Sequence, residues 1–237
     1  MNRFFVPPGS IVDENFVLRD PDTVHQIGKV LRAQIGAKII LLDNSGMEFP
    51  AEILEISRHE ISLQILEKRE NQAEPDLQIN LFQALPNSPS KFEEILQHTT
   101  EVGIAGFFPV IAERSETRKL RKIERLEKIL QEAAEQSERG KIPTIAEPIK
   151  FAKVWNEPPA GLNLIADSFS REPLLKNFDN EIQEYGTTNV FVGPEGGWSA
   201  KEIELAKKFG AHTFSLGPRI LRTETAGVAI ASAIFFG

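Results

Sequence analysis

Residues 189–206 read NVFVGPEGGWSAKEIELA, and residues 212–227 read HTFSLGPRILRTETAG. In each segment an apolar strand candidate runs into a glycine-containing loop, and a helix candidate follows that loop. Ligands of open α/β sheets bind beyond the carboxyl ends of the strands, so these two loops are the first candidates for a binding site. The glycines allow a ligand to approach the backbone closely. The two segments therefore predict an α/β domain with a site at one edge of its sheet.

Toward the N-terminus, strand and helix candidates continue to alternate as far back as residue 77. Such alternation predicts a largely parallel sheet with helices on both faces. Ser90 with Glu93, and Ser199 with Glu202, form S-x-x-E capping boxes that mark helix starts. The expected strands are 77–85, 107–111, 162–166, 189–193 and 212–217, and the expected helices are 90–103, 117–139, 173–185, 199–209 and 228–236.

The first third of the chain has a different pattern. Residues 37–66 alternate apolar and polar positions around a turn at 43–46, which predicts antiparallel strands in a small sheet or barrel. Asp20 and Pro21 signal a short helix that would pack through Val24, Ile27 and Leu31. The polar stretch KRENQAEPD marks a boundary near residue 73. We therefore expect two domains, 1–72 and 73–237.

Composition and charge exclude several classes of protein. The chain has 237 residues, with 41% apolar and 26% charged side chains, as in an ordinary soluble protein. Its net charge of −7 excludes nucleic-acid binding by bulk positive charge, so any RNA contact must come from local patches. Cysteine is absent and the four histidines are scattered, so we expect no metal site. With no signal peptide and no apolar run long enough to span a bilayer, we expect a cytoplasmic protein without a membrane partner.

The first loop, residues 193–198, reads GPEGGW. It is neither a Walker loop, since no Gly-Lys-Ser/Thr follows, nor a G-x-G-x-x-G dinucleotide turn. Glu195 places a carboxylate where a polyphosphate would lie, so a neutral or cationic ligand fits this loop better. S-adenosylmethionine carries a positive sulfonium and no phosphate. The alternative is an ordinary strand-turn-helix connection without a ligand.

The second loop, residues 217–227, gathers basic, hydroxyl and carboxylate side chains directly before an apolar helix. Within it, a dense cluster of hydrogen-bond donors and acceptors is formed by Arg219, Arg222, Thr223, Glu224 and Thr225. In the alternative interpretation, a threonine caps the last helix and the arginines pair with surface carboxylates. Residue types alone therefore predict a pocket with a polar rim.

Both loop segments resemble the signature pair of the SPOUT methyltransferases, specifically the RsmE-type enzymes that methylate N3 of a uridine in 16S ribosomal RNA. Four further segments resemble this family in the family's order: RFFV at 3–6, HQIGKVLRAQIG at 25–36, TEVGIAGFFPVIAERS at 100–115 and EAAEQSERGKIP at 132–143. The resemblance thus covers nearly the whole chain. The chain departs from the family pattern in two respects: His98 and Thr99 stand where a lysine is usual, and Leu126 stands where an aromatic residue is frequent.

The resemblance implies a PUA-like β-barrel at the N-terminus and a SPOUT α/β domain in which the chain from about Asn189 onward forms a trefoil knot. It also implies a homodimer that packs through the knot regions. Helix 228–236 suits such an interface, and an ordinary core helix is the alternative. The implied cofactor is S-adenosylmethionine. Its implied binding residues are Ala166, Gly193, Pro194, Glu195, Gly196, Gly197, Leu216, Gly217, Ile220, Leu221, Arg222, Thr223, Thr225 and Ala226.

Methylation of a uridine at N3 sets chemical demands on the site. N3 must lose its proton, and the remaining negative charge spreads over O2 and O4. A cation should face these oxygens, and Arg222 is the catalytic candidate for this electrostatic role, with Arg219 second. Glu224 is the nearest carboxylate in sequence and the candidate base. Alternatively, Glu224 anchors Arg222 in a bidentate pair, or the proton leaves through water.

Candidate RNA contacts lie in two places. Three residues of the first helix candidate recur at i, i+4 and i+7 and would share one helical face. Residues 113–128 contain seven Lys or Arg and four Glu, a local charge of +3. Solvated helix faces are the alternative. The candidate RNA-binding residues are Arg3, His25, Lys29, Arg32, Arg114 and Arg118, and the expected partner is 16S ribosomal RNA or the small ribosomal subunit.

Other functions remain open at this point. A related knotted enzyme would act on transfer RNA or on a ribose 2′-hydroxyl, and a catalytically silent protein would use the barrel alone to bind RNA. A nicotinamide-dependent dehydrogenase would bind NAD, which the acidic first loop disfavours. Titration with S-adenosylmethionine separates an enzyme from a silent module, because the silent module would show no saturable binding.

Overall fold

The chain divides into two compact units in a computed structural model that describes residues 1–167 and 174–236. The first unit contains Met1–Glu74 and Ala134–Ile142, and the second contains Pro75–Ala133 and Pro143–Gly237. The later segment Ala134–Ile142 thus packs with the first unit, which the sequence pattern did not indicate. The expected boundary between 72 and 73 stays a prediction.

One acidic side chain holds this returning segment in the first unit. The Glu74 carboxylate accepts hydrogen bonds from the backbone N–H groups of Gly140 and Lys141 at 3.0 and 3.1 Å. It also pairs with the Arg139 guanidinium at 3.0 Å, and the Arg139 side chain is only 4% exposed. A largely buried charge with hydrogen-bonded partners fixes this segment because an unpaired charge there would be costly.

The strands of the first unit are β1 (Arg3–Phe5), β2 (Asn15–Leu18), β3 (Lys38–Leu42), β4 (Met47–Ile56), β5 (Ile61–Ile65) and β6 (Arg69–Glu70). They form a sheet in the order β1-β3-β4-β5-β2, with β6 paired to β4. The predicted antiparallel pairing of β3 with β4 and of β4 with β5 is confirmed. Leu41, Ile53 and Ile61 are fully buried and belong to the apolar core of this unit.

The helix of the first unit begins as predicted. Asp20 caps it by accepting a hydrogen bond from the Thr23 backbone N–H at 2.8 Å, and Pro21 occupies its first turn. Helix α1 (Pro21–His25) is then continued by a π-helical turn, η1 (Gln26–Val30). The wider π-helical turn changes which side chains face the core.

The packing predicted for this helix is correct at two of its three apolar positions. Val24 and Ile27 are buried, but Leu31 is 40% exposed, so the prediction for Leu31 was wrong. The turn η1 ends at Val30, and Arg32 takes a left-handed backbone conformation with φ of 50°. The regular helical spacing behind the prediction therefore does not extend to Leu31.

The strands of the second unit are β7 (Gln78–Ala84), β8 (Gly106–Ile111), β9 (Thr144–Ile145), β10 (Ile149–Lys150), β11 (Leu162–Ala166), β12 (Thr187–Val192) and β13 (His212–Phe214). The order is β10-β8-β7-β12-β11-β13, with β9 paired to β8. Every one of these pairings is parallel, which confirms the predicted parallel sheet. The last strand ends at Phe214, three positions before the predicted end.

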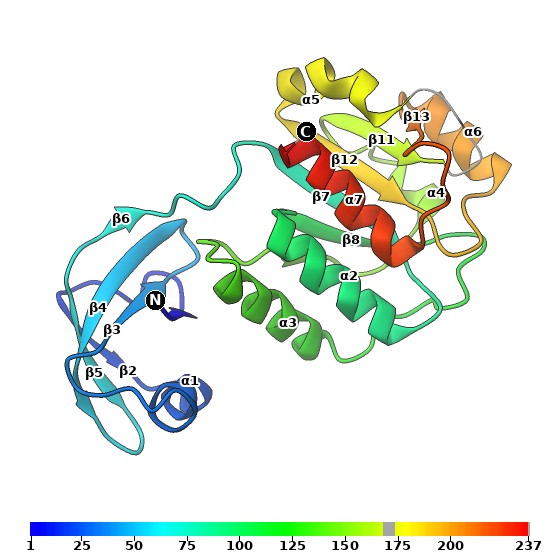
Figure 1. Cartoon of the computed structure of the whole chain (residues 1–237). Coiled ribbons are helices and arrows are strands. Elements are labelled where there is room, and N and C mark those ends of the chain that lie inside the picture. Colours follow the sequence, from blue (N-terminus) through cyan, green and yellow to red (C-terminus); the bar gives the residue numbers. More distant parts are fainter. Residues whose placement is uncertain (168–173, 237) are drawn as a thin grey trace. The chain divides into compact units, whose positions relative to one another are not determined.

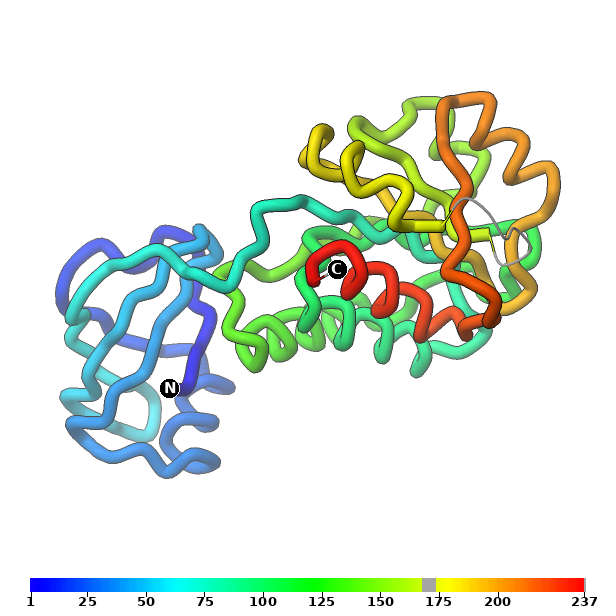
Figure 2. The backbone as a smooth tube through the Cα atoms, turned by 45° about the horizontal axis from the view of Figure 1, so that its top comes forward, coloured from blue at the N-terminus to red at the C-terminus, as the bar shows by residue number. Residues whose placement is uncertain are grey.

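The remaining helices are α2 (Pro89–Val102), α3 (Ile123–Gln136), α4 (Phe151–Val154), η2 (Leu175–Phe178), α5 (Asp179–Tyr185), α6 (Ala200–Lys208) and α7 (Thr223–Phe236). Helices α2 and α7 lie side by side on one face of the sheet (Figures 1 and 2). On β7, Leu81 lies so near α7 that a Cβ placed at Gly227 would be 3.3 Å from it, whereas its neighbour Phe82 belongs to an apolar cluster with residues of α4 and α6. Helices therefore cover both faces, as predicted.

Two predicted helix starts differ from the structure. Helix α2 begins at Pro89 after Ser88, and Ser90 with Glu93 does not form a capping box. The Glu93 carboxylate instead accepts two hydrogen bonds of 2.8 Å from Arg125. A proline at the first position and a competing arginine explain the difference.

The long charged helix predicted from residue 117 begins only at Ile123. Lys122, directly before it, has a φ of 55°, which interrupts helical geometry. The helix predicted for residues 173–185 consists of η2 followed by α5, and its predicted start at Pro173 lies outside the described residues.

Candidate active site

Four neighbouring strands of the parallel sheet, β7, β12, β11 and β13, end at the same edge. The segments that follow these strands meet there and line a cavity of about 300 Å³. They include the start of α2 after β7, the loop at 193–198 after β12 and the loop at 215–222 after β13. The two glycine loops therefore share one cavity, of the size that small ligands occupy.

Most of the residues proposed to hold a cofactor line this cavity. The lining includes Ala166, Gly193, Pro194, Glu195, Gly197, Leu216, Gly217, Ile220, Leu221, Arg222, Thr223 and Ala226. Gly196 and Thr225 are outside it. The carbonyl oxygen of Gly196 accepts a hydrogen bond of 2.7 Å from Arg114, and Thr225 is an exposed residue of α7. The binding roles of all these residues stay predictions.

Hydrogen bonds hold the two loops together. The Thr223 hydroxyl donates to the carbonyl oxygen of Gly193 at 2.8 Å and accepts from the buried Gln83 amide at 2.9 Å. The first loop then enters α6 through the predicted capping box of Ser199 and Glu202, which is confirmed. Thr223 thus connects the second loop to the first loop and to strand β7, so the cavity walls are preorganised.

Arg222 and Glu224 lie on the cavity wall but are not tightly paired. Arg222 Nη1 is 3.9 Å from Glu224 Oε1, and the Arg222 side chain is 85% exposed. A bidentate anchor between them, one of the alternatives above, is not formed. Glu224 is only 18% exposed, and its buried Oε2 has no hydrogen-bond partner within residues 1–167 and 174–236. This oxygen is free to accept a proton or a hydrogen bond from a ligand.

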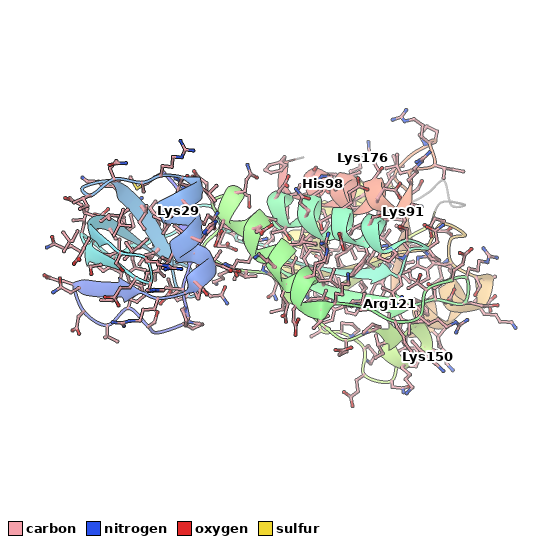
Figure 3. All side chains as sticks on the ribbon, turned by 90° about the horizontal axis from the view of Figure 1, so that it is seen from below. Lys29, Lys91, His98, Arg121, Lys150 and Lys176 are labelled. Carbon is pink, nitrogen blue, oxygen red and sulfur yellow. The ribbon has the colours of Figure 1, made fainter. Side chains whose placement is uncertain are left out.

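Six residues of the cavity were not among the predicted site residues: Lys91, Asp167, Val192, Trp198, Phe214 and Ser215. Lys91 lies near the start of α2 (Figure 3) and pairs with Glu195 at 2.8 Å. The Asn87 backbone N–H donates to the same Glu195 oxygen at 3.2 Å. Because β7 and β12 are adjacent parallel strands, the start of α2 lies near the first loop. This strand order is not visible in the local sequence pattern.

The ion pair shifts the pKa of both partners. Burial acts to raise the pKa of Glu195, but hydrogen bonds from Lys91, from its own backbone and from Asn87 outweigh burial and hold the pKa below the usual 4.5. The hydrogen bond to Glu195 raises the pKa of Lys91 above the usual 10.5 against a smaller opposing effect of burial. Both groups are therefore charged at neutral pH.

We expect Glu195→Gln to lower the free energy of unfolding at neutral pH and not in acid. A carboxylate with a lowered folded-state pKa stabilises the fold above its unfolded pKa, and this contribution is lost as the pH falls through the folded value, below 4.5. Urea unfolding of both proteins should show a constant difference from about pH 5.5 to 9 that shrinks as the pH falls below 4.5. A difference that stays constant on acidification contradicts the prediction. Glu204→Gln, on an exposed position of α6, is the control.

The candidate RNA-binding residues differ in their solvent exposure and in their ion pairs. His25, Lys29 and Arg32 are exposed on the first unit, and Lys29 is labelled in Figure 3. Arg3 is only 10% exposed and pairs with Glu48 at 3.3 Å and with Glu138 at 2.7 Å. We therefore leave Arg3 out of the RNA-binding surface proposed below.

Arg114 and Arg118, the two RNA-binding candidates that follow β8, also differ in their contacts. Arg114 donates hydrogen bonds to the carbonyl oxygens of Gly196 and Trp198, at 2.7 and 3.4 Å, and so supports the first glycine loop. Arg118 is exposed and lines a second cavity. His98, which the sequence analysis singled out, is exposed on α2 (Figure 3).

Two further features bear on the kind of site. None of the helices within residues 1–167 and 174–236 combines the length and apolar character needed to cross a membrane. The same part of the chain contains no group of three or more His, Asp or Glu side chains arranged to hold a metal ion.

A parallel α/β unit that closes a glycine-lined cavity at its carboxyl edge belongs to the class of enzymes that bind a nucleotide-like cofactor at that edge. Residues 73–235 match the family model of the RNA methyltransferase domain, and residues 18–66 match that of the RNA methyltransferase PUA domain. This chain belongs to the RNA methyltransferase family, and it combines an α/β methyltransferase domain with a PUA-like domain.

Named relatives are similar over almost the whole chain. Ribosomal RNA small subunit methyltransferase E of Synechocystis is 34% identical, and the match covers 94% of this chain and 74% of that protein. The enzyme of the same name from Bacillus subtilis is 30% identical over 91% of this chain and 88% of its own length. A crystal structure of that enzyme from Neisseria gonorrhoeae, bound to S-adenosylmethionine, has a TM-score of 0.87 and 30% identity, and covers 99% of this chain and 96% of its own.

Proposed function

We propose that this protein transfers the methyl group of S-adenosylmethionine to N3 of a uridine in 16S ribosomal RNA. The observation that carries the proposal is the single cavity shared by the two glycine loops, with carboxylates in its wall. Membership of the RNA methyltransferase family supports it, as do the names of the relatives and the cofactor bound in the Neisseria gonorrhoeae enzyme.

The residues of the cavity fit this cofactor. Much of the wall is loop backbone around Gly193, Gly197 and Gly217, whose peptide groups can bind the adenine and ribose. Asp167 adds a carboxylate that suits a ligand of positive charge, whereas the charge of Glu195 is already paired with Lys91. When bound, the cofactor supplies an electrophilic methyl group. The loops hold that group in place and exclude water while the base approaches.

We assign Arg222 to the negative charge that develops on the uracil oxygens and Glu224 to the N3 proton. The Glu224 oxygen without a partner supports this assignment because it is a buried acceptor beside the cavity. Arg222 directly precedes α7, the helix that carries Glu224. Within the described residues, no carboxylate forms a bidentate pair with Arg222 that would neutralise its charge. Arg219 lines the same cavity and remains the second candidate.

Lys29 and Arg32, which are both exposed, are proposed to contact RNA phosphates. Lys29→Gln with Arg32→Gln should weaken binding to 16S ribosomal RNA and reduce the slope of log K against log salt by about 0.7 to 0.9 for each phosphate that is no longer neutralised. Lys153→Gln with Lys208→Gln, which removes two exposed charges of the second unit, is the matched control. Equal slopes for the two double variants would exclude this surface.

We extend the proposal to the finer architecture, in which the N-terminal sheet closes into a PUA-like barrel and the chain from about Asn189 onward is tied in a trefoil knot. Hydrogen bonds from Asp167 to Phe214 and from Leu175 to Ser215 support the knot, because β13 and its following loop lie against two earlier segments. When the protein is stretched from both ends, its maximum extension should be shorter than the full contour length, whereas an unknotted chain would extend completely.

A homodimer in the cytoplasm completes the proposal. Ile220 and Phe236, near the two ends of the segment that contains α7, are each 77% exposed, and such apolar side chains suit a partner surface. Most of α7 packs against α2 and the sheet, so only its exposed positions are available. Light scattering should give twice the mass of the chain, and a monomer at micromolar concentration would contradict the dimer.

Mass mapping of 16S ribosomal RNA tests the enzymatic proposal directly. RNA from cells that lack this protein should miss one N3-methyluridine, and reintroducing the gene should restore it. Loss of a methyl group from transfer RNA or from a ribose 2′-hydroxyl would instead favour the related knotted enzymes. Saturable binding of S-adenosylmethionine without any change in RNA methylation would contradict the proposed substrate.

A further inference from the structure

A second cavity lies one position further along the same edge of the sheet. It has a volume of about 540 Å³ and is lined by residues that follow β7 and β8, the neighbour of β7 on the side away from β12. Its wall comes from the segments 85–93 and 116–121 together with Leu126. The mechanism proposed above uses none of this space.

The floor of the second cavity is apolar. Leu85, Phe92 and Leu126 line it and are 1%, 3% and 4% exposed. Leu120 adds a half-buried apolar side chain from the loop before α3. An apolar recess of this kind suits a flat ring that must leave water, such as an unstacked nucleobase.

The rim of the second cavity is basic. Arg118, Lys119 and Arg121 line it and are exposed, and none has an ion pair within the described residues. Glu93, on the same wall, already binds Arg125 through two hydrogen bonds of 2.8 Å, so it does not neutralise them. Glu116 also lines the cavity, which leaves a local excess of positive charge. Free cations beside an apolar recess complement a nucleotide, whose phosphates are charged and whose base is not.

The two cavities share a wall. The start of α2 carries Lys91 on the first cavity and Phe92 on the second. Asn87, in the loop between β7 and α2, donates a hydrogen bond from its backbone N–H to Glu195 of the first cavity. Figure 3 labels Lys91 and Arg121 on this part of the second unit. Occupants of the two cavities would therefore be neighbours, as successive nucleotides of one strand are.

We propose that the second cavity binds a nucleotide adjacent to the target uridine in the substrate RNA. Its base packs on Leu85, Phe92 and Leu126, and its flanking phosphates contact the basic rim. This inference rests on the proposed function for its RNA substrate. It adds a site that selects the sequence around the target, because a base must be unstacked from its neighbours to enter.

Ultraviolet cross-linking tests the proposal. The full-length protein is irradiated with unmethylated 16S ribosomal RNA from cells that lack it, and adducts are located by mass spectrometry. We expect nucleotide adducts on Phe92 or within residues 116–121. Adducts found only elsewhere would overturn the proposal, including the case in which the cavity serves an acidic protein segment instead.

Charge variants give a second measurement, the salt dependence of RNA binding, which would not change if these residues had a purely structural role. Arg118→Gln with Lys119→Gln and Arg121→Gln should flatten the salt dependence of RNA binding by about 0.7 for each phosphate left without its cation, and should leave the affinity for S-adenosylmethionine unchanged. The control removes three exposed lysines of the same unit, through Lys153→Gln, Lys207→Gln and Lys208→Gln. Identical salt slopes for the two triple variants would refute the site.

The two proposals fail in different ways. If the protein methylates RNA but neither adducts nor salt slopes involve the second cavity, the inference fails and the proposed function stands. If the cavity binds RNA but no uridine loses its methyl group in the deletion strain, the proposed function fails and only RNA binding at the second cavity remains.

Discussion

Arg222→Ala is expected to lower the rate of methyl transfer by about 100- to 1,000-fold, the usual cost of removing one preorganised group that stabilises charge in a transition state. The negative charge on the uracil oxygens exists only after N3 loses its proton, so the role proposed for Arg222 stabilises the transition state and not the bound cofactor. The side chain is 85% exposed, and removing it leaves no cavity in the core. The affinity for S-adenosylmethionine should therefore change far less than the rate.

Single-turnover transfer to unmethylated 16S ribosomal RNA and calorimetric titration with S-adenosylmethionine measure the two quantities separately. Arg219→Ala is the matched variant, because it removes the same group from the same loop and should have the smaller effect on rate. If Arg222→Ala reduces rate and cofactor affinity equally, Arg222 is part of the cofactor pocket and has no special role in the reaction. Unchanged rates would remove it from the site altogether.

The site at the sheet edge could be anticipated because local sequence controls it. The strand end, the glycines and the capping box of Ser199 and Glu202 lie within one short stretch, so a local sequence pattern reveals them. The parallel sheet followed from the alternation of strands and helices. A local pattern does not show which strands are neighbours in the sheet. The contribution of the segment after β7 to the site was therefore not predicted, and Lys91 was missed although it pairs with Glu195.

Ion pairs between residues far apart in sequence explain two differences between the sequence predictions and the structure. Glu93 was expected to cap a helix, but Arg125, far away in sequence, binds its carboxylate. Arg3 was predicted to join the RNA-binding residues, and in the structure its side chain pairs with Glu48 and Glu138. In both cases a charged side chain has a long-range partner that residue types do not reveal, and a charge-assisted hydrogen bond outweighs a weak local preference.

A ladder of three asparagines crosses the centre of the parallel sheet. Asn80 on β7, Asn189 on β12 and Asn163 on β11 lie in register. Asn189, which is 1% exposed, accepts a hydrogen bond from Asn80 at 2.9 Å and donates to Asn163 at 3.2 Å and to the Ala160 carbonyl oxygen at 2.8 Å. A shift of β12 by one residue would break all three bonds, so the ladder fixes the register of the strand that carries the first glycine loop.

Asn189→Leu is therefore expected to lower the free energy of unfolding by about 3 to 5 kcal/mol, since each buried polar group left without a partner costs about 1 to 3 kcal/mol. The adjacent Thr188 provides the control: it is equally buried, and its hydroxyl already has no hydrogen-bond partner in the described part of the chain. Thr188→Val removes a polar atom without orphaning another and should leave stability unchanged or raised. Urea unfolding measures both variants. Equal destabilisation of the two would mean that close packing at this strand, and not the hydrogen-bonded ladder, supports the sheet.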